Sequence, residues 1–355
     1  MEGKIKTHTL SIQKAVDHHN TLPKKNCLLA ISNEEKKCFL RSPVLEELKS
    51  LVTLIEITHP ITDWFETLRE TNAEIIVTGW TTPALPPDLP LEKLSLKYVA
   101  HVTGSIRTHI PRPLIEKGLF VTNWGTSVSK TIAESTVFMI MAALRKVGYW
   151  QNVIHNQSSW NQDIFNHGTL SIINRNIGIH GFGNIAKQLI PMLIPFSVKI
   201  SAYCPYTPDE VFDAYQVHRA PTLNNLFSDN DVIVILSALT DETKDSITKT
   251  QLDLIPDDGV FVNSARAAIV NEADLIEVAH SNRIRIALDV FHQEPLPEDS
   301  PLRGNHNIIL TPHTAGPTPD RMIDAGQHML HNIRQFSSGK KIDGVIDIET
   351  YDLMT

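Results

Sequence analysis

Short apolar runs alternate with longer amphipathic stretches along most of the chain. The runs predict β-strands because they are short, rich in branched residues and bounded by turn residues, whereas the stretches between them have helical spacing. In the first half, strands are expected at residues 26–32, 51–57, 74–79, 96–103 and 120–123, with intervening helices at 43–51 and 61–72. Alternation of this kind predicts parallel βαβ units.

The alternation stops at residue 129 and starts again after residue 174. A long apolar helix is expected over Ser129 to Tyr149, and its Glu134, Ser135 and Arg145 favour a buried helix over a membrane span. Further strands are expected at 176–180, 199–203, 217–220, 231–237, 259–265, 283–291 and 307–310, with a last helix at 321–336. The pattern therefore predicts an α/β protein with two doubly wound parallel-sheet domains. Residues 1–24 have little periodicity and are expected to form an extension.

Composition narrows the possible partners. The net charge of −8 and the scattered Lys and Arg residues give no electrostatic basis for binding nucleic acid or an anionic membrane. Cys27, Cys38 and Cys204 have no CxxC spacing, and the N-terminus has no apolar signal region, so we expect a cytoplasmic protein with reduced thiols. No HExxH or clustered ligand pattern predicts a metal site.

A glycine turn lies halfway along the chain, in IGIHGFGNIAKQLI at residues 177–190. Gly181, Gly183 and Ala186 satisfy the spacing G-x-G-x-x-G/A after a strand and before a helix. The first glycine allows a tight turn, the second lets backbone approach a pyrophosphate, and the alanine keeps the helix close to the sheet. The helix N-terminus then offers N–H groups to the anion. The turn therefore predicts a dinucleotide site that includes its intervening residues, Phe182, Asn184 and Ile185.

Two further residues qualify this prediction. Pro191 is expected to kink or shorten the helix that follows the turn. At the end of the next strand, Cys204 stands where an acid would bind the adenosine ribose and repel a 2′-phosphate. Because no Arg or Lys follows closely to attract that phosphate, NAD is favoured and NADP stays open.

Four ordered stretches carry a family resemblance: GIHGFGNIA, LTDETKDSITKTQLDLIPDDGVFVNSARAAIVNEADL, ALDVFHQEPLPEDSPL and NIILTPHTAG. With them the chain resembles the D-isomer-specific 2-hydroxyacid dehydrogenases over most of residues 95–317. The resemblance implies a Rossmann nucleotide domain (126–317) inserted into a flavodoxin-like substrate domain (1–125 and 318–355). It also implies an active site in the cleft between them, and a homodimer formed through the helix and segment at 126–170.

Three residues match the family's catalytic positions: Arg266, Glu294 and His313. The resemblance implies that Arg266 grips the carboxylate of a 2-oxo acid, for which a guanidinium fork is suited. His313 is expected to exchange a proton with the substrate oxygen, and Glu294 to orient its ring. Ala267 replaces a glycine that is common in the family, so a slightly different loop is expected there.

Other candidates have structural alternatives. Gly104 and Ser105 resemble the family's carboxylate-binding loop, whereas Arg107 can add charge there or form a surface salt bridge. Asp289 resembles a contact to the cofactor amide but can also be a loop cap. Thr240 and Ser264 can line the cofactor cleft or satisfy local backbone, and Trp80 can shape the substrate pocket or pack under a loop. His180 is expected at a core or edge position.

The first functional hypothesis is therefore an NAD(P)-dependent dehydrogenase that interconverts a small 2-oxo acid and a D-2-hydroxy acid. The alternative is a nucleotide-sensing binding protein, because some relatives of this fold act as corepressors. Glu294 disfavours the formate dehydrogenase branch, which pairs Gln with the histidine. Glyoxylate, hydroxypyruvate and larger 2-oxo acids remain open as substrates.

Overall fold

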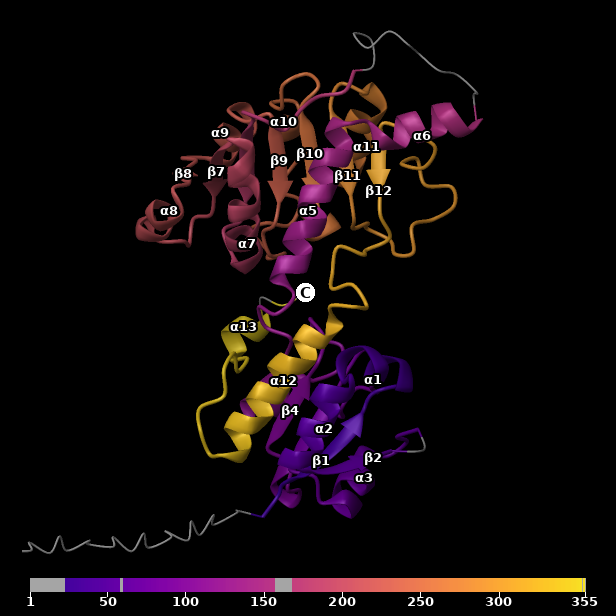
Figure 1. Ribbon diagram of the computed structural model, residues 1–355, viewed down its shortest axis with the longest axis vertical. Helices are drawn as coiled ribbons and strands as arrows, with labels where there is room; N and C mark the ends of the chain where they lie inside the picture. The colour runs from indigo at the N-terminus through magenta and orange to yellow at the C-terminus, as the bar shows by residue number, and fades with distance from the viewer. Residues whose placement is uncertain (1–22, 58–59, 157–167, 353, 355) are drawn as a thin grey trace, which may run out of the picture.

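The computed structural model describes residues 23–57, 60–156, 168–352 and 354. The extension expected over residues 1–24 lies outside them except for its last two positions, as does the part of the dimerisation segment at 157–167. The elements form two lobes, each built on a parallel sheet (Figure 1). The prediction of two doubly wound α/β units is confirmed.

The first lobe contains a five-stranded parallel sheet in the order β2-β1-β3-β4-β5. Its strands are β1 (Asn26–Ala30), β2 (Thr53–Glu56), β3 (Ile75–Thr78), β4 (Tyr98–His101) and β5 (Phe120–Thr122). This is the order of flavodoxin-like sheets. All residues of β3 and β4 are buried, as central strands covered on both faces require.

Helices cover both faces of this sheet. One face carries α1 (Asn33–Phe39), α2 (Ser42–Leu51) and α12 (Met322–Ser337), and the other carries α3 (Trp64–Thr71), α4 (Arg112–Glu116) and α13 (Ile348–Asp352). Figure 1 shows the C-terminal α12 against the N-terminal elements, and it contacts α1, α2 and β4. The packing agrees with a discontinuous substrate domain of residues 1–125 and 318–355, and we keep these boundaries as a proposal.

The second lobe contains a seven-stranded parallel sheet in the order β12-β11-β10-β9-β6-β7-β8. Its strands are β6 (Asn176–His180), β7 (Lys199–Tyr203), β8 (His218–Arg219), β9 (Val232–Ile235), β10 (Val260–Asn263), β11 (Arg285–Leu288) and β12 (Ile308–Leu310). Counted from β6, the order is 3-2-1-4-5-6-7, which is the Rossmann order with one added strand.

The helices of this lobe also lie on both faces. Those on the first face are α5 (Ser129–Leu144), α7 (Asn184–Leu193) and α8 (Asp209–Tyr215), and those on the second are α9 (Leu223–Ser228), α10 (Lys249–Leu252) and α11 (Glu272–Ser281). Helix α7 continues past Pro191 for two residues and then gives way to a 3-10 turn (Ile194–Phe196), so it is short, as expected.

The prediction of a single helix over Ser129 to Tyr149 is wrong. The chain breaks at Lys146, which adopts a left-handed backbone (φ 51°), and α6 (Val147–Asn156) follows. The Leu144 carbonyl accepts hydrogen bonds from the Leu170 N–H (2.8 Å) and from Nη1 of the buried Arg285 (2.6 Å). These distant donors replace the helical N–H groups that a continuous helix would supply.

The same helix is buried on one face only. Phe138 (56% exposed) and Met141 project from α5 into solvent, although Met139 and Ile140 between them lie in the core. The expectation of a buried helix is therefore half right. None of the helices in the described part of the chain combines the length and apolarity needed to cross a bilayer.

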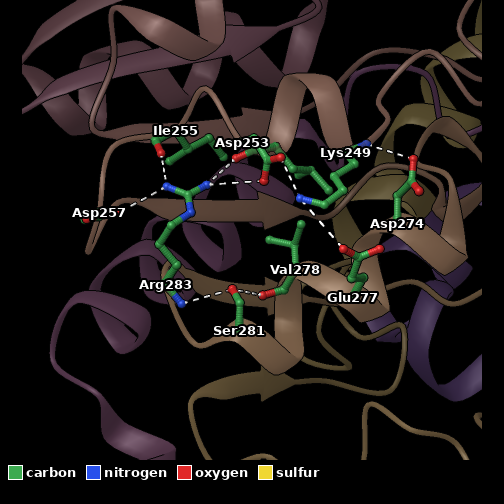
Figure 2. A network of polar contacts seen from close by, with 10 residues as sticks. Lys249, Asp253, Ile255, Asp257, Asp274, Glu277, Val278, Ser281 and Arg283 are labelled. Atoms are coloured by element: carbon green, nitrogen blue, oxygen red, sulfur yellow. Dashed lines mark hydrogen bonds and ion pairs between the residues drawn. The ribbon is translucent and has the colours of Figure 1, made fainter.

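A polar network fastens α10 to its neighbours (Figure 2). Nη2 of Arg283 donates to the carbonyl of Leu252 at the end of α10 (2.9 Å), and the backbone N–H of Lys249 donates to Oδ2 of Asp274 on α11 (2.8 Å). The exposed Lys249–Asp253 ion pair adds little by itself. The bonds to backbone groups satisfy helix ends, which makes this network structural.

Candidate active site

A cavity of about 1240 Å³ lies between the two lobes. Its walls are loops that follow the carboxyl ends of strands in both sheets: β3, β4 and β5 in the first lobe and β9 to β12 in the second. Ligands of open α/β sheets bind at this edge, and typical pockets measure about 300–1,000 Å³, so the cavity has room for two ligands. A second cavity, of about 270 Å³, lies at the amino ends of β6 and β7 and is not near these loops.

His313 and Glu294 form a pair in this cavity. Nδ1 of His313 lies 2.7 Å from Oε2 of Glu294, which leaves Nε2 as the nitrogen available to a ligand. The second carboxylate oxygen, Oε1, accepts the N–H of Phe291 (2.9 Å). His313 has a left-handed backbone (φ 53°), a conformation that costs a non-glycine residue about 1 kcal/mol or more and is often found at functional sites.

The environment of Glu294 favours its charged form. Partial burial acts to raise its pKa, but the hydrogen bonds from His313 and the Phe291 N–H, with the charges of His313 and Arg266, outweigh that effect. The net result is a pKa below the usual value for a glutamate. Glu294 is therefore a carboxylate at neutral pH and can hold the proton on Nδ1 of His313.

Arg266 lies on the loop after β10 and also lines the cavity. Burial lowers the pKa of Arg266, and nearby Glu294 partly opposes that effect. The buried side chain of Asn263 fixes the loop: its Nδ2 donates to the Arg266 carbonyl and its Oδ1 accepts the Ala265 N–H, both at 3.0 Å. Ala267 opens a 3-10 turn (Ala267–Ile269), a backbone that alanine adopts readily.

Asp289 holds the loop that carries His313. It is 1% exposed, and its two carboxylate oxygens accept the backbone N–H groups of Thr314 and Ala315, both at 2.8 Å. The Thr311 hydroxyl also donates to it (2.5 Å). The structure thus shows the loop cap that the sequence allowed, and a contact from Asp289 to a cofactor amide stays a prediction. Neither this role nor that of Asn263 has a sequence signature, because both depend on which loops meet.

The glycine turn fits a dinucleotide. Gly181 has φ 97°, and a Cβ there would lie 2.6 Å from the backbone nitrogen of Ser237. Gly183 is the N-cap of α7, no side chain caps it, and a Cβ there would have no atom within 4 Å. An open cradle of N–H groups at a helix N-terminus suits a pyrophosphate. Ile185 lines the cavity, whereas the side chain of Phe182 is buried in the core.

The remaining turn residue and the expected adenosine end lie outside the cavity lining. Asn184 begins α7, and Cys204 follows β7, where its Sγ accepts a hydrogen bond from the Thr207 hydroxyl (3.2 Å). Arg219, which the sequence pattern did not indicate, reaches from β8 and donates to the Cys204 carbonyl (3.0 Å) and to Asp209 (2.6 Å). Nothing in the sequence indicated this contact, because Arg219 is far from Cys204 along the chain and only the pairing of β7 with β8 brings the two residues together.

Other predicted residues divide between the cavity and its surroundings. Ser264 lines the cavity and pairs with the Thr136 hydroxyl (3.1 Å), whereas the Thr240 hydroxyl donates to Glu242 (2.8 Å) outside it. His180 is buried at the end of β6, as expected. Among the described residues, no group of three or more His, Cys, Asp or Glu side chains is placed to hold a metal ion.

In the first lobe, Trp80, Gly104 and Ser105 line the cavity. Arg107 is not brought into it: Nη1 donates to the Met354 carbonyl (2.9 Å), and the guanidinium lies over the Tyr351 ring. His109, which the sequence analysis did not single out, does line the cavity. A histidine on an irregular loop has no pattern by which it could have been found.

The fold and these loops together define a two-domain, dinucleotide-binding α/β protein. Residues 137–315 match the model of the family "D-isomer specific 2-hydroxyacid dehydrogenase, NAD binding domain", and the chain belongs to this family. NAD is the cofactor of the matched domain.

Individual relatives agree with this assignment. D-3-phosphoglycerate dehydrogenase of Methanocaldococcus jannaschii is 30% identical over 66% of this chain, which spans 44% of that protein's length. Glyoxylate/hydroxypyruvate reductase A of Arabidopsis thaliana is 29% identical over 64% of this chain and 71% of its own. The solved D-lactate dehydrogenase with NAD+ from Lactobacillus jensenii has the same fold, with a TM-score of 0.75 and 21% identity over 91% of this chain and 99% of that one.

Proposed function

We propose that this protein is an NAD-dependent dehydrogenase that interconverts a 2-oxo acid and a D-2-hydroxy acid. The observation that carries the proposal is the His313–Glu294 pair, which shares one cavity with Arg266. An imidazole backed by a carboxylate and a guanidinium are the groups needed to move a proton and to hold a carboxylate. The alternative of a nucleotide-sensing protein has no specific observation in its favour.

The residues divide the chemistry between them. When bound near the glycine turn, the nicotinamide cofactor supplies or accepts the hydride. Arg266 binds the substrate carboxylate, which fixes the position of the neighbouring carbonyl group. His313 gives a proton from Nε2 to the substrate oxygen during reduction and removes it during oxidation, while Glu294 holds Nδ1 and keeps the ring oriented. Gly104 and Ser105 approach the substrate from the opposite lobe.

The choice of nicotinamide cofactor is the finer part of this proposal. Cys204 supplies no carboxylate for the adenosine ribose hydroxyls, and the guanidinium of Arg219 is committed to the loop at residues 204–209. We infer that the protein uses NAD, and the experiment described below tests NADP as the alternative. Cys204 and Thr240 lie outside the cavity lining, and we keep them as proposed contacts to the part of the cofactor outside the cavity.

We also infer a homodimer formed through α5 and α6. Apolar side chains lie exposed on these two helices: Phe138, Met141, Val147, Tyr149 and Ile154. An apolar patch of this kind marks an interaction surface. The expected location in the cytoplasm stays a prediction, supported by three cysteines that are all free thiols.

The test is a panel of 2-oxo acids, each assayed with NADH and with NADPH by loss of nicotinamide absorbance. We expect turnover with NADH. His313→Ala should lower kcat by about 10²–10⁴-fold, the range of general acid–base catalysis, with NADH affinity unchanged. Glu294→Gln, which keeps a hydrogen-bond acceptor without the charge, should cause a smaller loss. Unchanged turnover in His313→Ala would refute the mechanism, and NADH binding without turnover of any acid would favour the nucleotide-sensing alternative.

A further inference from the structure

The substrate side of the cavity has an aromatic wall. Trp80 follows β3, lines the cavity and is 49% exposed. Its ring lies edge-on to Trp124, with centroids 6.1 Å apart, and tilted against the buried Phe39 at 5.6 Å. Trp124 also lines the cavity. An indole that remains half exposed inside a cavity presents a large apolar surface to whatever binds there.

Hydrogen bonds hold this wall in place. Nε2 of His109 lies 3.1 Å from the Trp80 carbonyl, and the His109 carbonyl accepts the N–H of Leu85 (2.8 Å). The Thr82 hydroxyl accepts the Gly79 N–H (2.8 Å), which fixes the residue before Trp80. The loops after β3 and β4 are thus joined, so the wall is formed before a ligand binds.

The Arg and Lys side chains that line the cavity supply positive charge for one substrate carboxylate. Among the described residues that line it, Arg266 is the one arginine, and no lysine is present. Both ring nitrogens of His109 have partners, the Trp80 carbonyl and the Thr108 hydroxyl. Arg107 is directed to the Met354 carbonyl instead. A phosphate or a second carboxylate on the substrate would therefore be buried without a cation.

We propose that the substrate is a 2-oxo acid with a single carboxylate and an aryl side chain, which packs against Trp80. The inference rests on the proposed function, because Arg266 must already hold the carboxylate. The aromatic wall favours phenylpyruvate-like acids over glyoxylate, which is too small to cover it. It also disfavours phosphorylated acids, because the described lining of the cavity has no second Arg or Lys to pair with a phosphate. Trp80 is then a specificity-determining residue, and His109 positions it.

The experiment measures kcat/KM for phenylpyruvate, glyoxylate and 3-phosphohydroxypyruvate in the unsubstituted protein and in three variants. The native protein should prefer phenylpyruvate by at least about tenfold. Trp80→Ala should lower kcat/KM for phenylpyruvate by about 10- to 100-fold and change that for glyoxylate by less than about threefold, whereas Trp80→Phe should retain most activity. Phe120→Ala is the matched control, because Phe120 is 47% exposed at the amino end of β5, away from the cavity.

Calorimetry with D-phenyllactate and glycolate, each in the presence of NAD+, separates this inference from the proposed reaction. If no acid is turned over but D-phenyllactate binds and Trp80→Ala weakens that binding, the reaction fails and the aromatic pocket stands. If glyoxylate or 3-phosphohydroxypyruvate is the preferred substrate, or if Trp80→Ala lowers activity on all acids equally, the aromatic pocket is refuted and the reaction stands.

Discussion

Buried polar side chains decide where the proposed catalytic groups lie. Both carboxylate oxygens of Asp289 accept N–H groups of the backbone next to His313. The side-chain amide of Asn263 donates to one backbone group of the Arg266 loop and accepts from another. Removing such a partner leaves backbone polar groups unsatisfied, at a cost of about 1–3 kcal/mol each where they are buried. Glu294 differs because it is partly exposed and contacts the imidazole itself. The residues that position the site are therefore more deeply buried than the residues that would act in it.

Two other buried side chains make stability depend on pH. Burial, aided by the nearby His109 for His101, lowers the pKa of His101 to about 3, and burial lowers that of His180 to about 4. An unfolded histidine has a pKa of about 6.5, so below that value the unfolded chain binds protons that the folded chain does not. The free energy of unfolding should therefore fall by about 2 kcal/mol per histidine between pH 7 and pH 5.

Urea unfolding at pH 7, 6 and 5 measures this decline. His180→Gln should remove one of the two contributions and flatten the dependence on pH by about half. An identical pH dependence in the variant would show that His180 is not buried in its neutral form.

At the scale of elements, tertiary contacts fix one boundary of each of two helices, the start of α7 and the end of α5. Helix α7 starts at Asn184, after its N-cap Gly183, because the turn before it passes against Ser237, beyond the end of β9. Helix α5 ends at Leu144 because Arg285 and Leu170 occupy its carbonyl. The glycine pattern predicted the first boundary correctly. The second could not be predicted, since the apolar spacing continues through Lys146 and the competing donors lie far away in the sequence.

The two glycines of the turn should respond differently to substitution. Gly181→Ala forces a Cβ against Ser237 at a positive φ, so we expect a thermal midpoint several degrees lower and NADH binding at least about tenfold weaker. A methyl group at position 183 has open space, so Gly183→Ala should keep the stability of the protein. It should still weaken NADH binding, because the methyl group enters the pyrophosphate cradle. Differential scanning fluorimetry and NADH fluorescence titration measure the two effects. Equal behaviour of the variants would argue against separate roles.

At the scale of the whole molecule, the chain builds one lobe, then the other, and returns to the first through α12 (Figure 1). The cavity exists because the carboxyl ends of both sheets face it. None of the exposed apolar side chains of α5 and α6 lines the cavity, so the proposed dimer interface and the cavity lining consist of different residues.

Phe138→Glu tests the proposed dimer. A charge in an apolar interface should raise the dimer dissociation constant by at least about 100-fold. Analytical ultracentrifugation across micromolar concentrations measures it. Tyr206→Glu is the control, because Tyr206 is 80% exposed on the loop after β7, and it should leave the dimer intact. A native protein that is monomeric at these concentrations would contradict the assignment of this surface.

The sequence by itself determined the strand and helix alternation and the dinucleotide turn, because periodicity and glycine spacing are local properties. Arg266, Glu294 and His313 became candidates through the family resemblance of the stretches that contain them. The resemblance implied the contact between Glu294 and His313, and the tertiary structure shows it. Only the tertiary structure decided that Arg107 does not line the cavity and that Arg219 reaches Cys204. It also decided that Trp80 faces the cavity while Phe182 is buried in the core. These outcomes depend on which loops meet when two sheets fold, and residues far apart in a chain carry no local signal of their meeting.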